Sequence, residues 1–206
     1  MPDIRCPLGT SEGDSSMPQP PLLPVIDWSK VFTSGVEFEA WLSLAEYPER
    51  AGAMREAALQ QPLEPAAEAL AASLTRTVHV VAIAEDWCGD VVRHVPVLQR
   101  LAAASGGKLQ VRYIGRAQHL DLFARYLTNG GEAIPQFIFL NDQFVECGHW
   151  GPMPESGKRL IARGKGAGNV GAARQKVSAL YAADPDKREV VQELCALIET
   201  AVCIEP

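Results

Sequence analysis

The sequence predicts an α/β fold in which helices cover both faces of a mixed β-sheet. Two strand-and-helix units follow one another, an order typical of right-handed crossovers between parallel strands. A hairpin comes next and adds antiparallel strands, which makes the sheet mixed. The expected elements, in chain order, are a strand over 78–84, a helix over 89–104, a strand over 109–114, a helix around 120–127, and hairpin strands over 136–140 and 143–147.

The first unit has the clearest pattern. Residues 78–84 are Val-His-Val-Val-Ala-Ile-Ala, a nearly continuous apolar run that indicates a strand covered on both faces. The following helix carries apolar residues at helical spacing, among them Val91, Val95 and Leu98. Pro96 lies inside this helix, where a proline removes a hydrogen bond and introduces a kink.

The flanking segments predict helical extensions on either side of a central domain over 77–163. Residues 1–30 are rich in Pro, Ser, Gly and Asp and predict a flexible arm, and apolar residues recur at helical spacing over 31–76. Over 164–206 we expect a linker, from Gly164 to Gly171, and C-terminal helices that pack on the same domain.

Composition narrows the classes of function. The 206 residues are 47% hydrophobic and 21% charged, with a net charge of −6, which argues against nucleic-acid binding. No apolar run is long enough to span a membrane, and residues 1–30 lack the apolar stretch of a signal peptide. The five cysteines form an odd set without repeated spacing, which favours free thiols in a reducing cytoplasm. The oligomeric state does not follow from these features.

Cys88 lies where the first buried strand passes into a helix. Open α/β sheets place their chemistry at this edge, and free N–H groups at a helix start stabilise a thiolate. A lone cysteine also serves commonly as a small apolar residue, so position alone leaves both interpretations open.

Three features resemble the thioredoxin family: Trp87-Cys88-Gly89 at a strand–helix junction, Pro96 eight residues after the cysteine, and Ile134-Pro135 before the hairpin. The resemblance covers 77–163 and implies a thioredoxin-like sheet. It implies that Trp87 flanks the site, that Cys88 is the attacking nucleophile, and that Pro135 is a cis-proline shaping the substrate groove. The substrate-binding residues expected on this basis are Trp87, Gly89, Asp90, Ile134, Pro135, Gly148 and Trp150.

The sequence also departs from the family pattern. Val91 stands where the second motif cysteine is expected, Asp90 stands where proline is usual, and Ala82 replaces the buried acid. A dithiol cycle therefore cannot run within this motif. The variant Trp-Cys-Gly-Asp is similar to a bacterial branch of the family.

The charge of Asp90 has two opposite consequences. A carboxylate in the first turn of a helix is stabilised by the free N–H groups, but it disfavours a neighbouring Cys88 thiolate. Glu85 and Asp86 either add to this repulsion or supply a proton acceptor.

Cys147 is a candidate resolving cysteine. If the hairpin turns on Asn141-Asp142 with a two-residue loop, Phe139 pairs with Phe144 and Cys147 returns to the Pro135 end of the sheet; a longer loop shifts this by about one residue. The alternative is a small strand residue that lines the pocket. Convergence of Cys88, Cys147 and His149 would be needed for a soft metal site, and none of the four histidines has metal-ligand spacing with another.

Two functional hypotheses follow. The first is a thiol-disulfide oxidoreductase that uses Cys88 on protein or low-molecular-weight disulfides, with no organic cofactor and no metal. The second is a redox-inactive binding module for an extended peptide. The presence together of Trp87, Cys88 and Pro135 favours the enzyme, and the missing second cysteine favours the binding module.

Overall fold

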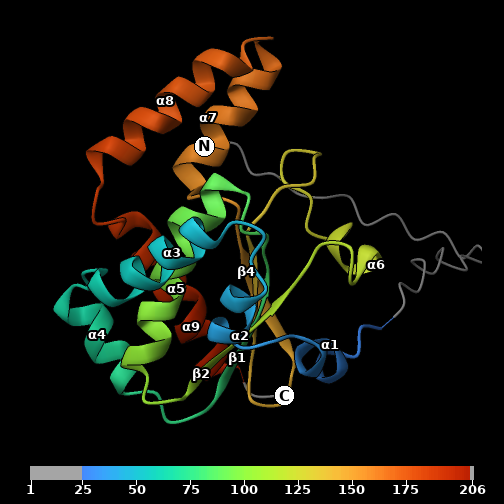
Figure 1. Cartoon of the computed structure of the whole chain (residues 1–206), viewed down its shortest axis with the longest axis vertical. Coiled ribbons are helices and arrows are strands. Elements are labelled where there is room, and N and C mark those ends of the chain that lie inside the picture. Colours follow the sequence, from blue (N-terminus) through green and yellow to red (C-terminus); the bar gives the residue numbers. More distant parts are fainter. Residues whose placement is uncertain (1–24, 205–206) are drawn as a thin grey trace, which may run out of the picture.

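The computed structural model describes residues 25–204 (Figure 1). Its elements, in chain order, are α1 (Trp28–Ser34), α2 (Phe38–Ser43), α3 (Pro48–Gln60), α4 (Pro65–Ala72), β1 (Val78–Ile83), α5 (Gly89–Ala104), β2 (Leu109–Ile114), α6 (Leu120–Phe123), β3 (Gln136–Leu140), β4 (Glu146–Trp150), α7 (Glu155–Gly166), α8 (Val170–Ala183) and α9 (Arg188–Cys203).

The four strands form one mixed sheet in the order β2-β1-β3-β4. β1 runs parallel to β2, and its partner on the other side, β3, is antiparallel to it. Every residue of β1 is buried, as its continuous apolar run predicts for a central strand. The predicted α/β fold with a mixed sheet is confirmed.

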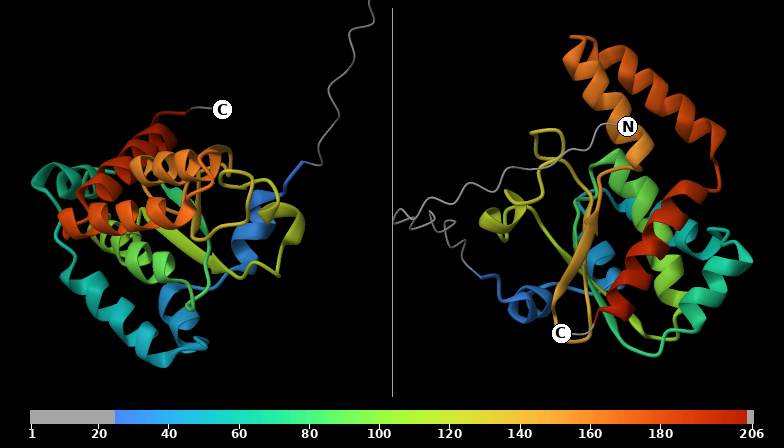
Figure 2. Two further views of the ribbon diagram at one scale, coloured as in Figure 1. Left: turned by 90° about the horizontal axis from the view of Figure 1, so that it is seen from above. Right: turned by 180° about the vertical axis from the view of Figure 1, so that it is seen from behind.

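Helices cover both faces of the sheet, as predicted. On one face, α9 packs against β1, β3 and β4, and α5 lies beside it against β2. On the other face, α1 packs on β1 and β2, with the Phe32 ring 4.8 Å from the His79 ring. Because side chains alternate along a strand, Val80 points toward the α9 face while His79 points toward α1. Figure 2 shows the sheet between these two layers.

The hairpin of β3 and β4 differs from its predicted register. Its loop runs over 141–145, and Phe139 pairs with Gly148, not with Phe144. The physical reason is the Asn141 side chain, which accepts hydrogen bonds from the backbone N–H groups of Gln143 and Val145, both at 2.9 Å. Phe144 takes a positive φ of 61° and stacks on His79 at 4.2 Å, so it cannot continue a strand.

Two of the predicted flanking segments also differ. The predicted linker over 164–171 is mostly helical, because α7 continues to Gly166 and α8 starts at Val170. Figure 1 shows α7 and α8 as a helical hairpin that projects from one end of the molecule. In the predicted arm, residues 1–24, which include Cys6, lie outside the described residues. Trp28, by contrast, is buried in α1. The predicted helix around 120–127 is shortened to α6, and Leu120 is exposed.

Candidate functional site

Cys88 is the N-cap residue of α5, directly after the turn that leaves β1. Its backbone is extended (φ −84°, ψ 125°), and its N–H group donates to the Glu85 carbonyl oxygen at 3.1 Å. The half-buried thiol donates a weak hydrogen bond to the Ile134 carbonyl oxygen, with Sγ and O 3.4 Å apart. The start of α5 and the start of β3 therefore meet at the Cys88 sulfur.

Two cis peptide bonds lie at this end of the sheet, Ile134–Pro135 and Gly151–Pro152. The chain leaving β4 passes so close to Pro135 that a Cβ on Gly151 would lie 2.0 Å from the Pro135 carbonyl oxygen. Gly151 also has a φ of +141°, a conformation that side chains rarely adopt. Glycine is therefore required where the end of β4 closes against Pro135.

The surroundings of Cys88 keep its thiol protonated at neutral pH. Burial raises the pKa of Cys88 above its ordinary value, and the charge of Asp90 adds to this effect. Hydrogen bonds from the backbone N–H groups of Val91 and Asp90 oppose it, as does the positive charge of Arg116. The thiolate-stabilising helix start is therefore present, but burial outweighs it.

Asp90 is held by a residue from a distant helix. The hydroxyl of Tyr181, in α8, donates to Asp90 Oδ1 at 3.0 Å and lies 3.2 Å from Nε2 of His94. Burial raises the pKa of Asp90, although the Tyr181 hydrogen bond and Arg93 oppose this. Burial lowers the pKa of His94 to about 3, so its ring is neutral. Asp90, Tyr181 and His94 form a polar cluster beside Cys88, which we call the Tyr181 cluster.

Trp87 flanks the site on the exposed side. It is 40% exposed, and the Arg116 guanidinium lies 5.1 Å from its ring centroid. Arg116 also faces the carboxylates of Glu85 and Glu132 at 3.9 and 3.8 Å. Arg50 donates a hydrogen bond to the Trp87 backbone carbonyl oxygen. Arg116 therefore holds the ring of Trp87, and Arg50 holds its backbone.

The two acidic residues before Trp87 are engaged elsewhere. Asp86 is buried and accepts a hydrogen bond from the Tyr47 backbone N–H at 2.6 Å. Glu85 accepts from the Arg116 backbone N–H at 2.9 Å. Asp90 is thus the acidic side chain that acts on the thiol of Cys88.

Other predicted site residues lie around Cys88 as well. Gly89 is exposed, and open space surrounds the position that a Cβ would take there. Ile134 and Pro135 are buried beneath the thiol, which leaves the Ile134 carbonyl oxygen as their polar contact with Cys88. Val91 and Ala82, at the positions of the absent cysteine and acid, are fully buried.

Cys147 does not return to the Pro135 end of the sheet, so that prediction is wrong. In the observed register it lies at the bulge opposite Phe139 and Leu140, near the hairpin loop, and its thiol donates to the Val145 carbonyl oxygen at 3.2 Å. The four residues from Pro135 to Phe139 span about 13 Å of strand. A disulfide needs Cα atoms about 4.4–6.8 Å apart, so Cys147 cannot reach Cys88 in this structure.

Gly148 and Trp150 are not on the expected peptide-binding surface. A Cβ on Gly148 would lie 2.8 Å from the Leu197 side chain, so this residue faces α9. Trp150 is only 3% exposed, and its indole N–H donates to Glu193 in α9 at 2.6 Å. The register shift moves both residues, and the Trp150 ring is buried because it stacks on Phe137.

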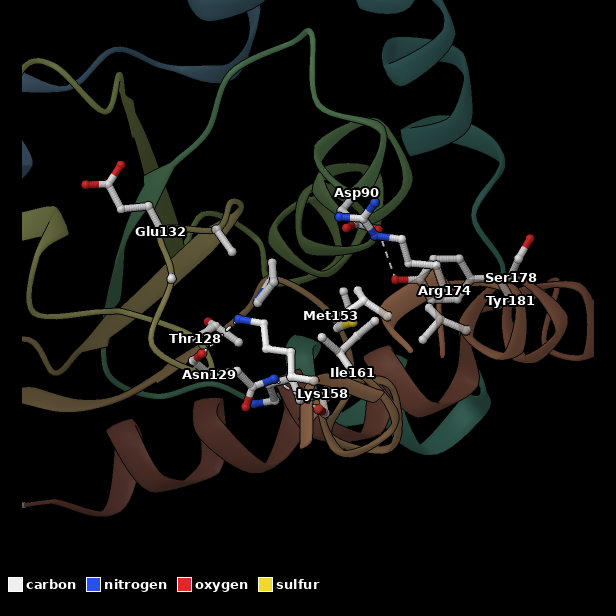
Figure 3. Close-up of a pocket in the computed structure, with 16 residues that line it drawn as sticks. Asp90, Thr128, Asn129, Glu132, Met153, Lys158, Ile161, Arg174, Ser178 and Tyr181 are labelled. Atoms are coloured by element: carbon white, nitrogen blue, oxygen red, sulfur yellow. Dashed lines mark hydrogen bonds between the residues drawn. The ribbon is translucent and has the colours of Figure 1, made fainter. Parts of the chain in front are cut away.

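A cavity of about 470 Å³ opens next to the Tyr181 cluster. It lies between the α7–α8 hairpin and the segment before Ile134, and residues from both form its wall. Figure 3 shows Asp90 and Tyr181 at one side of the cavity, with Thr128, Asn129 and Lys158 at the other. This site was not found from the sequence, because it depends on how α8 folds back over α5.

Residues 25–204 present neither a metal-ligand cluster nor a candidate membrane span. In this part of the chain, no three side chains of His, Cys, Asp or Glu come together as a set of metal ligands. Across the same residues, no helix has both the length and the apolar character that a bilayer crossing requires.

Comparison with known families decides the classification. The sequence profile described as thioredoxin matches residues 35–165, well over half of the chain. The chain belongs to the thioredoxin family. The match starts at residue 35 and so takes in α2, α3 and α4 as well as the sheet. No curated protein matches the chain significantly.

Solved structures confirm the thioredoxin-like fold. A protein of unknown function, PA1234, from Pseudomonas aeruginosa aligns with a TM-score of 0.65 and 18% identity, over 85% of this chain and 98% of that chain. An HIV epitope scaffold aligns with a TM-score of 0.64 and 17% identity, over 84% of this chain and 98% of that chain. At such identities the likeness concerns the fold alone.

Proposed function

We propose that this thioredoxin-family protein catalyses thiol-disulfide exchange with Cys88 as its single nucleophile. The observation that supports this most directly is the position of the Cys88 sulfur. It lies at the start of α5, where the backbone N–H groups of Val91 and Asp90 act to lower the pKa of the thiol, and it faces the Ile134 carbonyl beside Pro135. Cys88 is only half-buried and its neighbour Trp87 is 40% exposed, so a disulfide can dock on this side.

The exchange runs in three steps. The Cys88 thiolate attacks one sulfur of a protein disulfide, forms a mixed disulfide, and releases the other sulfur as a thiolate. A low-molecular-weight thiolate then attacks the Cys88 sulfur and forms a new disulfide with it, and the substrate protein leaves as its second thiolate. A second such thiolate breaks this new bond, which frees Cys88 and yields the small-molecule disulfide. The protein disulfide gains two electrons, and the two small thiols lose them.

Since burial keeps Cys88 protonated, its proton must leave before or during the attack. Asp90 is suited to take it, because it acts directly on the thiol and because its own raised pKa makes it a stronger base than an ordinary aspartate. Val91 replaces the second motif cysteine and Cys147 lies at the other end of β4, so neither position resolves the mixed disulfide, and we assign this step to a small thiol from outside the chain. A reducing cytoplasm supplies such thiols.

Paired cysteine variants test this function. With a fluorescent disulfide substrate and excess small thiol, Cys88→Ser should abolish the catalysed exchange, and Cys147→Ser should retain it. A mixed disulfide on Cys88 should also accumulate when the small thiol is omitted, as mass spectrometry would show. If Cys88→Ser exchanges disulfides as fast as the unsubstituted protein, Cys88 is not the nucleophile.

The second candidate is a redox-inactive module that binds an extended peptide beside Trp87 and Pro135. The raised pKa of Cys88 and the absence of the second cysteine favour it. The same assay distinguishes the two, because a binding module would form no mixed disulfide and would retain peptide binding in Cys88→Ser.

A further inference from the structure

We propose that the cavity between α7, α8 and the segment before Ile134 binds a small anionic thiol, the co-reactant that resolves the mixed disulfide on Cys88. The proposal rests on the function proposed above for the resolving role, but the binding of an anion does not depend on it. The volume of the cavity, about 470 Å³, falls in the range of pockets for small molecules and is too small for a folded partner.

The charges that line the cavity favour an anion. Three cationic side chains line it, Lys158, Lys165 and Arg174, against two acidic ones, Glu132 and Asp90. Within residues 25–204, the Arg174 side chain makes no ion pair or hydrogen bond, and the Lys165 ammonium donates one hydrogen bond, to the Asn129 carbonyl oxygen at 2.9 Å. These two cations therefore remain available to a carboxylate or a phosphate.

The acidic side chains of the lining are already engaged. Glu132 faces Arg116 at 3.8 Å, and Asp90 accepts the Tyr181 hydroxyl hydrogen bond at 3.0 Å. Lys158 is partly neutralised by Glu155, at 3.1 Å. The charge that a ligand meets is thus dominated by Lys165 and Arg174.

Apolar side chains also line the cavity. Met153 and Ile161 lie at the centre of the view in Figure 3, and Pro152 and Val177 also line the cavity. A ligand that combines a carbon chain with anionic ends matches this arrangement, because the chain covers the apolar side chains while its ends reach the cations.

The cavity also leads toward the reactive sulfur. Its wall includes Asp90, two residues after Cys88, and Ala133, directly before the residue whose carbonyl holds the Cys88 thiol. In this proposal, a thiol bound in the cavity attacks the mixed disulfide from the side of Asp90 and Tyr181, which line the cavity and are joined by a hydrogen bond. Cys88 itself does not line the cavity, so the two sites are adjacent and distinct.

Binding is best measured without covalent chemistry, by calorimetry on the full chain carrying Cys88→Ser in reducing buffer. One arm uses S-methylglutathione, which presents carboxylates and cannot exchange, and the other uses coenzyme A, which presents phosphates. We expect one of them to bind at micromolar to low-millimolar concentration. The diethyl ester of S-methylglutathione, which lacks both carboxylates, controls for the charge of the first ligand.

A matched pair of double variants tests the cationic residues. Lys165→Gln with Arg174→Gln removes two cations from the cavity, and should weaken binding by about tenfold. Arg163→Gln with Lys176→Gln removes two cations from the same two helices outside the cavity, and should change the affinity by less than about twofold. Both pairs change the net charge equally, so a long-range effect of charge would affect them alike.

The proposal is overturned if neither ligand binds at about 10 mM, if S-methylglutathione is the binder and its ester binds equally well, or if both double variants weaken binding equally. Its failure can be distinguished from that of the proposed function. Exchange at Cys88 without binding overturns only the cavity. Binding without exchange overturns the exchange function and the resolving role, and supports the cavity as an anion site.

Discussion

Removal of the Tyr181 hydroxyl should destabilise the protein through two groups at once. Tyr181→Phe keeps the ring, and with it the contact in which the Arg93 guanidinium lies 4.2 Å from the ring centroid. It removes the hydrogen bond to Asp90 at 3.0 Å and the contact with His94 Nε2 at 3.2 Å. His94 is fully buried, and its Nδ1 already lacks a partner within residues 25–204, so the variant leaves both ring nitrogens without one.

A buried polar group that loses its partner costs about 1–3 kcal/mol. Two groups are affected, but Asp90 also lines the cavity, where solvent can replace the hydroxyl, so we expect a total loss of about 2 kcal/mol. In a chain of this size that corresponds to a fall in Tm of about 4–8 °C. Urea unfolding at pH 7, followed by tryptophan fluorescence, measures the free energy of unfolding directly.

Tyr47→Phe is the matched control. Its ring also contacts an arginine, Arg50, but its hydroxyl makes no hydrogen bond within the described part of the chain. We expect the control to lie within about 0.5 kcal/mol of the unsubstituted protein. If Tyr181→Phe is equally neutral, the Tyr181 hydroxyl does not contribute to stability, and α8 docks through its other contacts, among them the Arg93 hydrogen bonds to the Tyr181 and Asp184 carbonyl oxygens.

Three further predictions concern the same region. Because the charge of Asp90 raises the pKa of Cys88, Asp90→Asn should lower the pKa of Cys88. The rate at which Cys88 reacts with an aromatic disulfide reagent should then begin to rise at a lower pH. An unshifted pH–rate curve would show that the charge is screened. The pKa of His94 falls to about 3 on folding, from about 6.5 in the unfolded chain. Between these two pH values the unfolded state therefore binds more protons than the folded state. Stability should fall by about 2 kcal/mol between pH 6.5 and pH 5, and His94→Gln should flatten this dependence in urea titrations, whereas an equally steep variant would assign it to another group. A Cβ on Gly164 would lie 2.4 Å from the Ala173 Cβ, and a Cβ on Gly166 would meet nothing within 4 Å. Gly164→Ala should therefore separate α7 from α8 and lower Tm, while Gly166→Ala should leave Tm unchanged or raise it; equal effects would show that the two helices do not pack closely there.

The first strand-and-helix unit could be predicted closely because its signals are local. The β-branched run of β1 and the helical spacing in α5 depend only on neighbouring residues, and the predicted bounds of α5 agree with the structure. The hairpin could not be predicted in the same way. Its register depends on hydrogen bonds of the Asn141 side chain and on the stacking of Phe144 against His79, a contact across 65 positions of sequence.

In the candidate site, too, the residues with local sequence signals were predicted and those that depend on long-range contacts were not. Cys88 and Pro135 were identified because each follows a recognisable local pattern, and they meet through the Ile134 carbonyl. Tyr181 was missed because nothing near it in sequence indicates that α8 folds back over α5. One signal was available, since Asp90 and His94 are four residues apart and so share a face of α5, where a common partner could bind both.

The positions of these polar groups explain how the chain departs from the thioredoxin pattern without losing its fold. At the positions of the expected acid and second cysteine, Ala82 and Val91 are fully buried, so the core beneath Cys88 holds no ionisable group there. The groups that act on the thiol instead lie at the surface of α5, where Tyr181 reaches Asp90 from α8. The Asp90 carboxylate therefore lies outside the core, where burying a charge would be costly. Its protonation depends on how closely α8 docks over it. The helical hairpin thus holds Asp90, whose charge acts on Cys88, and it also forms one wall of the adjacent cavity.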